Sequence, residues 1–416
     1  MNKTDVIIVG AGLAGLSCAR ELQAHGISFQ IVEASDGVGG RVRTDEVDGF
    51  LLDRGFQVLL TAYPETQRVL DYERLDLRPF YSGSLIWYGG ELHKLADPWR
   101  EPLDGVRGIT SPIGTLADKA RVGLLRSRVI QGSIEELFQR PEKTTLQALR
   151  DEGFSDSIIE RFFRPFLGGV FLSRDLDTSS RLFEFLFRMF SLGKTAVPAL
   201  GIQQIPLQLA ATLPEGAVRL HSEVTAVKPG QVTVAGGETL TAEIVVVATE
   251  GPAAARLLGQ AVAAPRSRSV TCLYFAAAEP PVTEPILVLN GMGQGLVNNL
   301  HVADRVARTY APVGQHLISV TVLGNPEGDD ATLETAVRQE LQEWFGSQTS
   351  AWRHLRTYRI RHAQPHQPPP TLQPPQRTVR LETGLYVCGD YRDNASINGA
   401  MVSGWRTGAA IANGLS

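Results

Sequence analysis

The sequence predicts an α/β protein of two domains. The first domain contains a parallel, doubly wound sheet assembled from separate parts of the chain. The second domain has mixed α+β structure. Three observations predict this. A glycine-rich turn follows an apolar strand near the N-terminus, a second apolar strand ends in Gly-Asp near the C-terminus, and a chain of 416 residues exceeds a single hydrophobic core.

The first motif runs from a strand into a glycine turn and then a helix. Residues 5–9 read DVIIV and predict a short buried strand, which the hexapeptide Gly10-Ala11-Gly12-Leu13-Ala14-Gly15 follows. An apolar helical pattern then leads to a second strand, Phe29 to Val32, which ends at Glu33. Strand, glycine turn, helix, strand and acid within about 30 residues predict a Rossmann-like dinucleotide-binding unit.

Each part of this unit has a physical role. Gly10 permits the tight turn, Gly12 removes a side chain where the backbone meets a pyrophosphate, and Gly15 lets the helix pack close to the strand. The helix N-terminus offers free N–H groups to phosphate. Glu33 can accept hydrogen bonds from ribose hydroxyls and disfavours a 2′-phosphate. The motif therefore argues against NADP and leaves NAD and FAD open.

The next segment, residues 34–44, carries a second glycine pair and reads ASDGVGGRVRT. Gly39 and Gly40 allow a close backbone approach, and Arg41 offers a forked donor suited to phosphate. Together with Glu33 and the first glycine turn, GGRVRT resembles the superfamily of FAD-dependent amine oxidases, phytoene desaturases and protoporphyrinogen oxidases. The resemblance implies a Rossmann-like FAD-binding domain with Arg41 at the FAD pyrophosphate.

A second motif near the C-terminus extends the resemblance. Residues 384–390 read GLYVCGD and predict a buried strand, and ASINGA at 395–400 opens a helix with small residues on one face. This is similar to the last FAD motif of the superfamily, in which the acid contacts the ribityl or phosphate region. The helix N-terminus there points at the pyrimidine edge of the flavin. Both the ASINGA segment and GDYRDNAS look most like plant-type phytoene desaturases, although an amide, Asn398, replaces the usual acid.

The resemblance also assigns two middle segments to the cofactor. The turn DRGFQ at 53–57 is expected to pass near the flavin, and the backbone of Val224, on an expected strand at 222–227, is expected to contact adenine. The implied cofactor-binding residues are Gly10, Ala11, Gly12, Leu13, Ala14, Gly15, Glu33, Ala34, Gly39, Gly40, Arg41, Val42, Gly55, Phe56, Gln57, Val224, Gly389, Asp390, Ser396, Ile397, Asn398 and Ala400. No metal site and no catalytic acid or base is predicted.

These motifs give a discontinuous FAD-binding domain. We expect it to comprise residues 1–60, 203–265 and 376–416, with residues 61–202 and 266–375 forming the substrate domain. A fully apolar strand is expected at 244–249. In the substrate domain we expect a hairpin at 285–302, whose GMGQG is no second nucleotide loop, and an amphipathic helix at 330–346. Without an NAD(P)H domain, the electron acceptor is expected to be oxygen, a quinone or another partner.

Two other stretches of the expected substrate domain have unusual composition. Nine of the 16 phenylalanines lie between Phe154 and Phe190, which favours a helical core and leaves an apolar tunnel or membrane-facing mouth as the alternative. Residues 359–376 contain six prolines and predict an extended connection back to the FAD domain. Its histidines, His362 and His366, are expected on the surface with no acid or base facing them.

The resemblance implies an oxidation in which a hydride passes from the substrate to flavin N5. Ser396 occupies the position where amine oxidases of the superfamily carry a cage aromatic, so a lipophilic, carotenoid-like substrate that is desaturated or isomerised is favoured. The alternatives are a flavin amine oxidase that produces hydrogen peroxide, a protoporphyrinogen-type oxidase, and a prenyl-lipid carrier without redox chemistry.

The composition and net charge of the chain limit its possible partners, its cysteine chemistry and its location. The net charge is -4, so nothing draws the whole chain to nucleic acid. Three cysteines fit neither a disulfide framework nor a zinc site, and reduced thiols are expected. No signal peptide or spanning helix is predicted, so we expect a cytoplasmic protein, with peripheral contact to a membrane as an open alternative.

Overall fold

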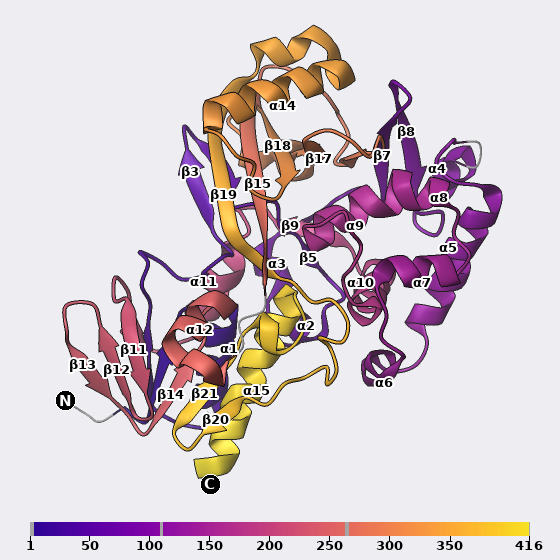
Figure 1. Cartoon of the computed structure of the whole chain (residues 1–416). Coiled ribbons are helices and arrows are strands. Elements are labelled where there is room, and N and C mark those ends of the chain that lie inside the picture. The colour runs from indigo at the N-terminus through magenta and orange to yellow at the C-terminus, as the bar shows by residue number, and fades with distance from the viewer. Residues whose placement is uncertain (1–3, 109–110, 263–265, 416) are drawn as a thin grey trace.

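The computed structural model describes residues 4–108, 111–262 and 266–415. Figure 1 shows a six-stranded sheet at the lower left, a seven-stranded sheet under α14 at the top, and a group of helices on the right. The strand orders are β10-β2-β1-β14-β21-β20 and β19-β15-β18-β17-β16-β7-β8. Within the described ranges, no helix has both the length and the apolar character needed to cross a membrane.

The six-stranded sheet begins with the predicted N-terminal unit. All its strand pairs are parallel except that of β20 and β21. Val6 and Ile8 pack on the side of helices α1 and α15, whereas Ile7 and Val9 pack against a small antiparallel sheet. Both faces are therefore covered, which explains why these strands are apolar throughout. The strands are β1 (Val6–Val9), β2 (Phe29–Val32), β10 (Val218–Arg219), β14 (Ile244–Val247), β20 (Arg380–Glu382) and β21 (Leu385–Val387).

Helices α1 (Leu13–Ala24) and α15 (Ile397–Leu415) pack directly against each other. A Cβ at Gly404 would overlap the carbonyl oxygen of Ala14, and one at Gly408 would lie 2.9 Å from that of Cys18. The small face predicted for the C-terminal helix is thus the face that contacts α1. The small sheet on the other side consists of β11 (Val224–Lys228), β12 (Gln231–Val234) and β13 (Thr239–Thr241).

The seven-stranded sheet has two differently covered faces. Helix α14 (Asp330–Phe345) lies over one face through Leu333, Val337, Leu341 and Trp344, as its amphipathic pattern predicts. The other face packs against the hairpin of β3 (Thr44–Val47) and β4 (Phe50–Asp53). The strands are β7 (Gly83–Tyr88), β8 (Glu91–Ala96), β15 (Ser267–Ala277), β16 (Leu287–Asn290), β17 (Val297–Val302), β18 (His316–Leu323) and β19 (Arg353–Pro365). β16 and β17 form the hairpin predicted at 285–302.

The phenylalanine-rich stretch forms helical core, as favoured. Phe154, Phe163, Phe171, Phe183 and Phe185 are each at most 5% exposed and pack within one cluster. The helices of this region are α4 (Pro102–Arg107), α5 (Leu116–Ile130), α6 (Ile134–Gln139), α7 (Thr145–Asp151), α8 (Asp156–Ile158), the π-helical turn Ile159–Phe163, α9 (Arg164–Phe171) and α10 (Ser180–Leu192).

Shorter elements connect these parts of the chain. They are β5 (Leu59–Leu60), β6 (Leu77–Pro79), β9 (Thr195–Pro198), α2 (Pro64–Val69), α3 (Tyr72–Leu75), α11 (Gln204–Ala210), α12 (Gly251–Leu258) and α13 (Ala303–Val306).

The proline-rich stretch differs from its prediction in two respects. Its first residues form the end of β19, which pairs with β15. They therefore belong to the seven-stranded sheet, whereas the whole stretch was predicted to be a connection between domains. The expectation that nothing charged faces His366 is wrong. Its Nε2 lies 2.8 Å from Asp177 Oδ2 and 2.8 Å from Arg268 Nη2, because the loop before α10 folds back over the end of β19. The prolines exclude a helix from this stretch, but they do not indicate which residues distant in the sequence will contact it.

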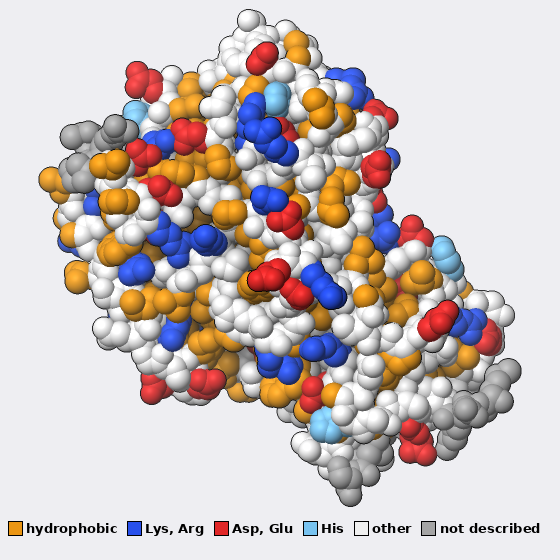
Figure 2. All heavy atoms as spheres, turned by 180° about the vertical axis from the view of Figure 1, so that it is seen from behind, with side chains coloured by type: hydrophobic (Ala, Val, Ile, Leu, Met, Phe, Trp, Pro, Cys, Tyr) orange, Lys and Arg blue, Asp and Glu red, His pale blue; other side chains and the backbone are white. Residues whose placement is uncertain are grey.

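Charges are distributed without large fields of one sign on the face shown in Figure 2, where basic and acidic side chains lie among one another. All three cysteines are buried and their thiols are free.

Candidate functional site

The glycine turn leaves the N-terminus of α1 open. Gly12 is the N-cap, no side chain caps the first turn, and a Cβ at Gly12 would have no other atom within 4 Å. The N–H groups of Leu13, Ala14 and Gly15 begin the helix beside this space. Gly10 has a φ of +104°, which favours glycine, and a Cβ at Gly15 would overlap the Gly10 carbonyl oxygen. The turn therefore offers an anion a backbone surface at the positive end of a helix.

Glu33 is held in place at the carboxyl end of β2. One carboxylate oxygen accepts a 2.7 Å hydrogen bond from the backbone N–H of Ala11. The other accepts from the backbone and hydroxyl of Ser35, at 2.8 and 2.7 Å. Each oxygen can accept more than one hydrogen bond, so a ribose hydroxyl can still bind here. Ala34 continues the chain past this acid. Glu33 also closes the glycine turn, a contact that sequence spacing alone did not indicate.

The GGR segment lies directly against the glycine turn. The Gly39 N–H donates to the Ala11 carbonyl at 2.8 Å, and a Cβ at Gly40 would lie 3.4 Å from the Gly12 Cα. The Val42 N–H donates back to the Gly39 carbonyl at 3.0 Å, which closes a turn around Arg41. The two glycine segments therefore form one continuous backbone surface.

Arg41 joins this surface to the C-terminal motif. Its guanidinium donates to Asp390 at 2.7 Å and to the carbonyl of Ala363 at 2.9 Å. Gly389 and Asp390 follow β21 after one residue, Cys388, so the acid lies at the same sheet edge as the glycine turn. On the other side, Gln57 donates to the Arg41 carbonyl at 2.8 Å. The segment that contains Gly55, Phe56 and Gln57 therefore contacts the GGR segment.

The remaining predicted residues begin α15 and β11. Ser396 caps α15 by accepting from the Gly399 N–H at 2.9 Å, and Asn398 accepts from the Glu65 N–H at 3.0 Å. Ile397 and Ala400 lie in the same first turn. The chain leading to Val224 pairs with the end of β2, where the Ser222 N–H donates to the Glu33 carbonyl at 2.8 Å.

These residues line the carboxyl edge of the parallel sheet, where ligands bind in open α/β folds. Three groups follow one another along this edge. They are the Glu33 carboxylate, which can accept hydrogen bonds from hydroxyl groups, the uncapped N-terminus of α1, and the guanidinium of Arg41. That order matches the adenosine and pyrophosphate of FAD, so the residues present fit the cofactor.

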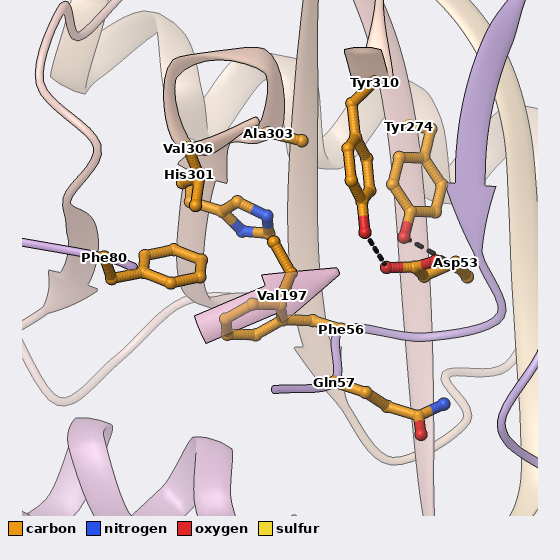
Figure 3. Close-up of a pocket in the computed structure, with 10 residues that line it drawn as sticks. All are labelled: Asp53, Phe56, Gln57, Phe80, Val197, Tyr274, His301, Ala303, Val306 and Tyr310. Atoms are coloured by element: carbon orange, nitrogen blue, oxygen red, sulfur yellow. Dashed lines mark hydrogen bonds between the residues drawn. The ribbon is translucent and has the colours of Figure 1, made fainter. Parts of the chain in front are cut away.

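A small cavity with a volume of about 10 Å³ lies beside this edge, between the β3–β4 hairpin and the seven-stranded sheet. Figure 3 shows ten residues that line it: Asp53, Phe56, Gln57, Phe80, Val197, Tyr274, His301, Ala303, Val306 and Tyr310. Phe56 and Gln57 belong to the segment predicted to pass near the flavin. The aromatic wall of this pocket comes from Phe56 and Phe80, and none of the nine phenylalanines between 154 and 190 is among these ten residues.

Asp53 is the centre of a buried hydrogen-bond network at one end of the pocket. Its carboxylate accepts from the Thr44 hydroxyl at 2.6 Å, the Ile202 N–H at 3.0 Å and the Tyr310 hydroxyl at 2.9 Å. The Tyr274 hydroxyl donates to the Asp53 carbonyl at 2.7 Å, as Figure 3 shows. Burial raises the pKa of Asp53 to about 6, while the three donors oppose that rise.

His301 lies at the opposite end of the pocket and is 6% exposed. Its ring centroid is 4.3 Å from that of Phe56 and 5.4 Å from that of Phe80. Its Nδ1 is buried without a hydrogen-bond partner, and burial lowers the pKa of the imidazole to about 3. The ring is therefore neutral near pH 7.

Of the ten pocket residues, sequence reasoning assigned a role only to Phe56 and Gln57. Asp53 lies in the DRGFQ turn, more than 200 residues before Tyr274, His301 and Tyr310, so no local pattern connects it to them. The only local signal is the alternation of β17. Leu300 and Val302 face α14, so a polar His301 between them must face the other side of the sheet.

Comparison with known proteins identifies the family. The family described as flavin containing amine oxidoreductase matches residues 13–412. A 4,4'-diapolycopene oxygenase of Methylomonas sp is 45% identical over 62 residues, which are 14% of this chain and 12% of that protein. A putrescine oxidase of Kocuria rosea is 43% identical over 67 residues, 16% of this chain and 14% of that protein. The aligned part is thus less than a sixth of either relative's length.

Solved structures match over nearly the whole chain. A putative protoporphyrinogen oxidase from Exiguobacterium sp. 255-15 has a TM-score of 0.75 at 19% identity and covers 100% of both chains. Cyclohexylamine oxidase from Brevibacterium oxydans IH-35A has a TM-score of 0.75 at 17% identity and covers 99% of both. Likeness at such identity concerns the fold, and it confirms the predicted fold class.

Proposed function

The chain belongs to the flavin containing amine oxidoreductases and is an FAD-dependent oxidoreductase, and we propose that its substrate is a lipophilic, carotenoid-like molecule that it desaturates or isomerises. The observation that carries this proposal is the state of the polar groups in the pocket. Gln57 is bonded to the Arg41 carbonyl, and the hydroxyls of Tyr274 and Tyr310 are bonded to Asp53. What these tyrosines present to a ligand is ring surface, beside Phe56 and Phe80. The cavity has a volume of only about 10 Å³, so an apolar ligand enters only if the lining side chains move apart, and it then loses few hydrogen bonds.

We assign the FAD to the carboxyl edge of the six-stranded sheet. Glu33 would bind the ribose, the open end of α1 and Arg41 the pyrophosphate, and the N-terminus of α15 the flavin. We assign residues 61–202 and 266–375 to substrate binding, because they supply the seven-stranded sheet behind the pocket. Bound FAD would supply a two-electron acceptor that takes a hydride from a substrate carbon.

The chain's own contribution to the reaction is then positioning and exclusion of water. Phe56 and Phe80 form a wall that orients an apolar chain beside Gln57, which contacts the GGR segment. A desaturated product lacks two hydrogens, of which one would leave as the hydride and the other as a proton that passes to solvent. The two electrons pass on to an acceptor, for which oxygen and a quinone are the candidates.

An amine oxidase is the second candidate function, and one observation favours it. Asp53 places a carboxylate with a pKa of about 6 at the end of an aromatic pocket, and such a group can attract a protonated amine. Against it, the carboxylate already accepts three hydrogen bonds.

Anaerobic mixing distinguishes these functions. The purified FAD-bound protein is mixed without oxygen with polyenes, amines and porphyrinogens, and the visible flavin band is followed. Bleaching by a polyene supports desaturation, whereas bleaching by amines alone refutes it and supports the second candidate. Bleaching by porphyrinogens alone refutes both.

A further inference from the structure

The last residues of β19 and the two that follow them, residues 363–367, contact two separate parts of the FAD site. β19 runs from the seven-stranded sheet toward α15 (Figure 1). At its end the Ala363 carbonyl accepts from the Arg41 guanidinium at 2.9 Å, and the Gln364 amide donates to the Ala395 carbonyl at 3.2 Å. This segment therefore links the arginine assigned to the pyrophosphate with the loop that leads into α15.

The side chain of Gln367 is 2% exposed and holds that loop, residues 393–395, at two points. Its Nε2 donates to the Asp393 carbonyl at 3.1 Å, and its Oε1 accepts from the Ala395 N–H at 2.8 Å. The donor and the acceptor of one amide are thus matched to an acceptor and a donor of the loop backbone. The main-chain carbonyl of Gln367 accepts from the N–H of Ser179, the N-cap of α10, at 2.9 Å, which fixes the glutamine itself.

The position of this loop determines where α15 begins. The Asn394 side chain accepts from the Ser396 hydroxyl at 2.6 Å, and that hydroxyl in turn accepts from the Gly399 N–H at 2.9 Å. A Cβ at Gly399 would overlap the Asn394 carbonyl oxygen, so the loop and the first turn of the helix are in direct contact. A displacement of the loop would therefore displace the first N–H groups of α15, which we assign to the flavin.

We propose that Gln367 is a positioning residue for the flavin, which acts by holding the 393–395 loop and hence the N-terminus of α15 in place. This inference rests on the assignment of FAD to the carboxyl edge of the six-stranded sheet, and it does not depend on which substrate is oxidised. A displaced helix N-terminus would attract the negative charge that a flavin gains on reduction less strongly, because the field of a helix end acts over about one turn. Gln367 should therefore affect both the affinity for FAD and the reduction potential of the flavin.

Replacing Gln367 by leucine tests this, because leucine has a similar size and no hydrogen-bonding group. In Gln367→Leu we expect the dissociation constant for FAD to rise about tenfold, the effect of about one hydrogen bond, and the flavin reduction potential to become more negative. The first is measured by flavin fluorescence and the second against a reference dye. A dissociation constant within about threefold of that of the parent protein would overturn the proposal, as would an unchanged reduction potential.

Asn290→Leu is the matched control for the loss of a buried amide. Asn290 is also 2% exposed, and its side chain bonds to the β16–β17 turn and to Glu340 on α14. This variant should lower the unfolding temperature without changing the affinity for FAD or the reduction potential. Equal changes of both quantities in Asn290→Leu and Gln367→Leu would overturn the proposal, because they would then reflect a general loss of stability.

Gln367→Glu should restore binding in a pH-dependent way. A carboxylate keeps an acceptor for the Ala395 N–H but has no donor for the Asp393 carbonyl, whereas a protonated carboxyl group supplies both. Burial favours the protonated form, so the dissociation constant should approach that of the parent protein near about pH 5 and exceed it near about pH 8. Burial also raises the pKa of Asp393 to about 6, and His366 lies next in the chain, but both are present in the two proteins. The ratio of the two dissociation constants is therefore compared, and a ratio that does not change with pH would overturn the proposal.

Hydrogen exchange in the parent protein tests the same contact where a variant fails to fold. The backbone N–H groups of residues 393–396 and of the glycine turn, residues 10–15, should exchange about tenfold more slowly with FAD bound than without it, because both segments are assigned to the cofactor. Slower exchange in the glycine turn alone would overturn the role of the loop and leave the pyrophosphate site standing. Unchanged exchange in both segments would contradict the assignment of FAD to this edge of the sheet, and the proposal with it.

Discussion

Replacing Gly12 by alanine should weaken FAD binding while leaving the stability of the FAD-free protein nearly unchanged. Gly12 has a φ of −73° and a ψ of 177°, which alanine adopts freely, and its Cβ would have no other atom within 4 Å. The stability of the protein without FAD should therefore change by less than about 0.5 kcal/mol. The new methyl group would occupy the space in front of the α1 N-terminus that we assign to the pyrophosphate.

The loss of FAD affinity follows from the contacts that the methyl group prevents. Displacing the pyrophosphate from the first N–H groups of α1 removes one or two hydrogen bonds to a charged group, each worth about 1.5–3 kcal/mol. A loss of about 3 kcal/mol corresponds to a roughly 100-fold weaker dissociation constant. The assay is a titration of the FAD-free protein with FAD by flavin fluorescence, together with thermal unfolding of both variants without FAD.

Gly15→Ala is the matched variant with the opposite expectation. Its Cβ would overlap the Gly10 carbonyl oxygen and lie 3.3 Å from the Ala248 Cβ, so α1 must move away from β1. We expect a loss of about 1–3 kcal/mol or more, with or without FAD. FAD binding by Gly12→Ala within about threefold of the parent protein would refute the assignment of the pyrophosphate to this turn, as would a loss of unfolding temperature in the FAD-free protein equal to that of Gly15→Ala.

Three further predictions concern buried acids and their donors. The pKa of Asp53 is raised from 3.8 to about 6, so its stabilising contribution is fully present below pH 3.8 and is lost as pH rises through 6. Between pH 4 and 7 the unfolding free energy of the parent protein should fall by about 3 kcal/mol relative to that of Asp53→Asn, as measured by urea denaturation. A difference between the two proteins that does not change with pH would contradict this. Tyr310→Phe removes a donor at 2.9 Å and should lower stability at pH 7.5 by about 1.5–3 kcal/mol in the same assay; an unchanged midpoint would argue against the network. Glu33→Gln replaces one acceptor oxygen by a donor facing Ala11 or Ser35, and should weaken FAD binding about tenfold, whereas unchanged affinity would remove Glu33 from the site.

The sequence predicted those parts of the fold that short-range patterns determine. The strands Phe29–Val32 and Ile244–Val247, the hairpin at 285–302 and the helix after Asp330 each follow from local periodicity. The link between Arg41 and Asp390 could be anticipated only because two recognisable motifs lie at opposite ends of the chain.

The pocket could not be predicted in the same way. Asp53, Tyr274, His301 and Tyr310 come together because the β3–β4 hairpin packs against the seven-stranded sheet and the turn at 308–310, and no spacing along the chain encodes that contact. His366 shows the same limit. A histidine among prolines reads as a surface residue, yet a loop nearly 190 residues earlier supplies Asp177 as its partner.

The measurement that tests the central claim most directly is anaerobic mixing of the FAD-bound protein with a polyene, with the flavin band and the organic product followed together. If the polyene is desaturated, we predict that the band bleaches while a product two hydrogens lighter appears in proportion to the polyene consumed. If it is isomerised, we predict that an isomer appears while the band stays intact. An intact flavin band together with unchanged polyene would contradict the account.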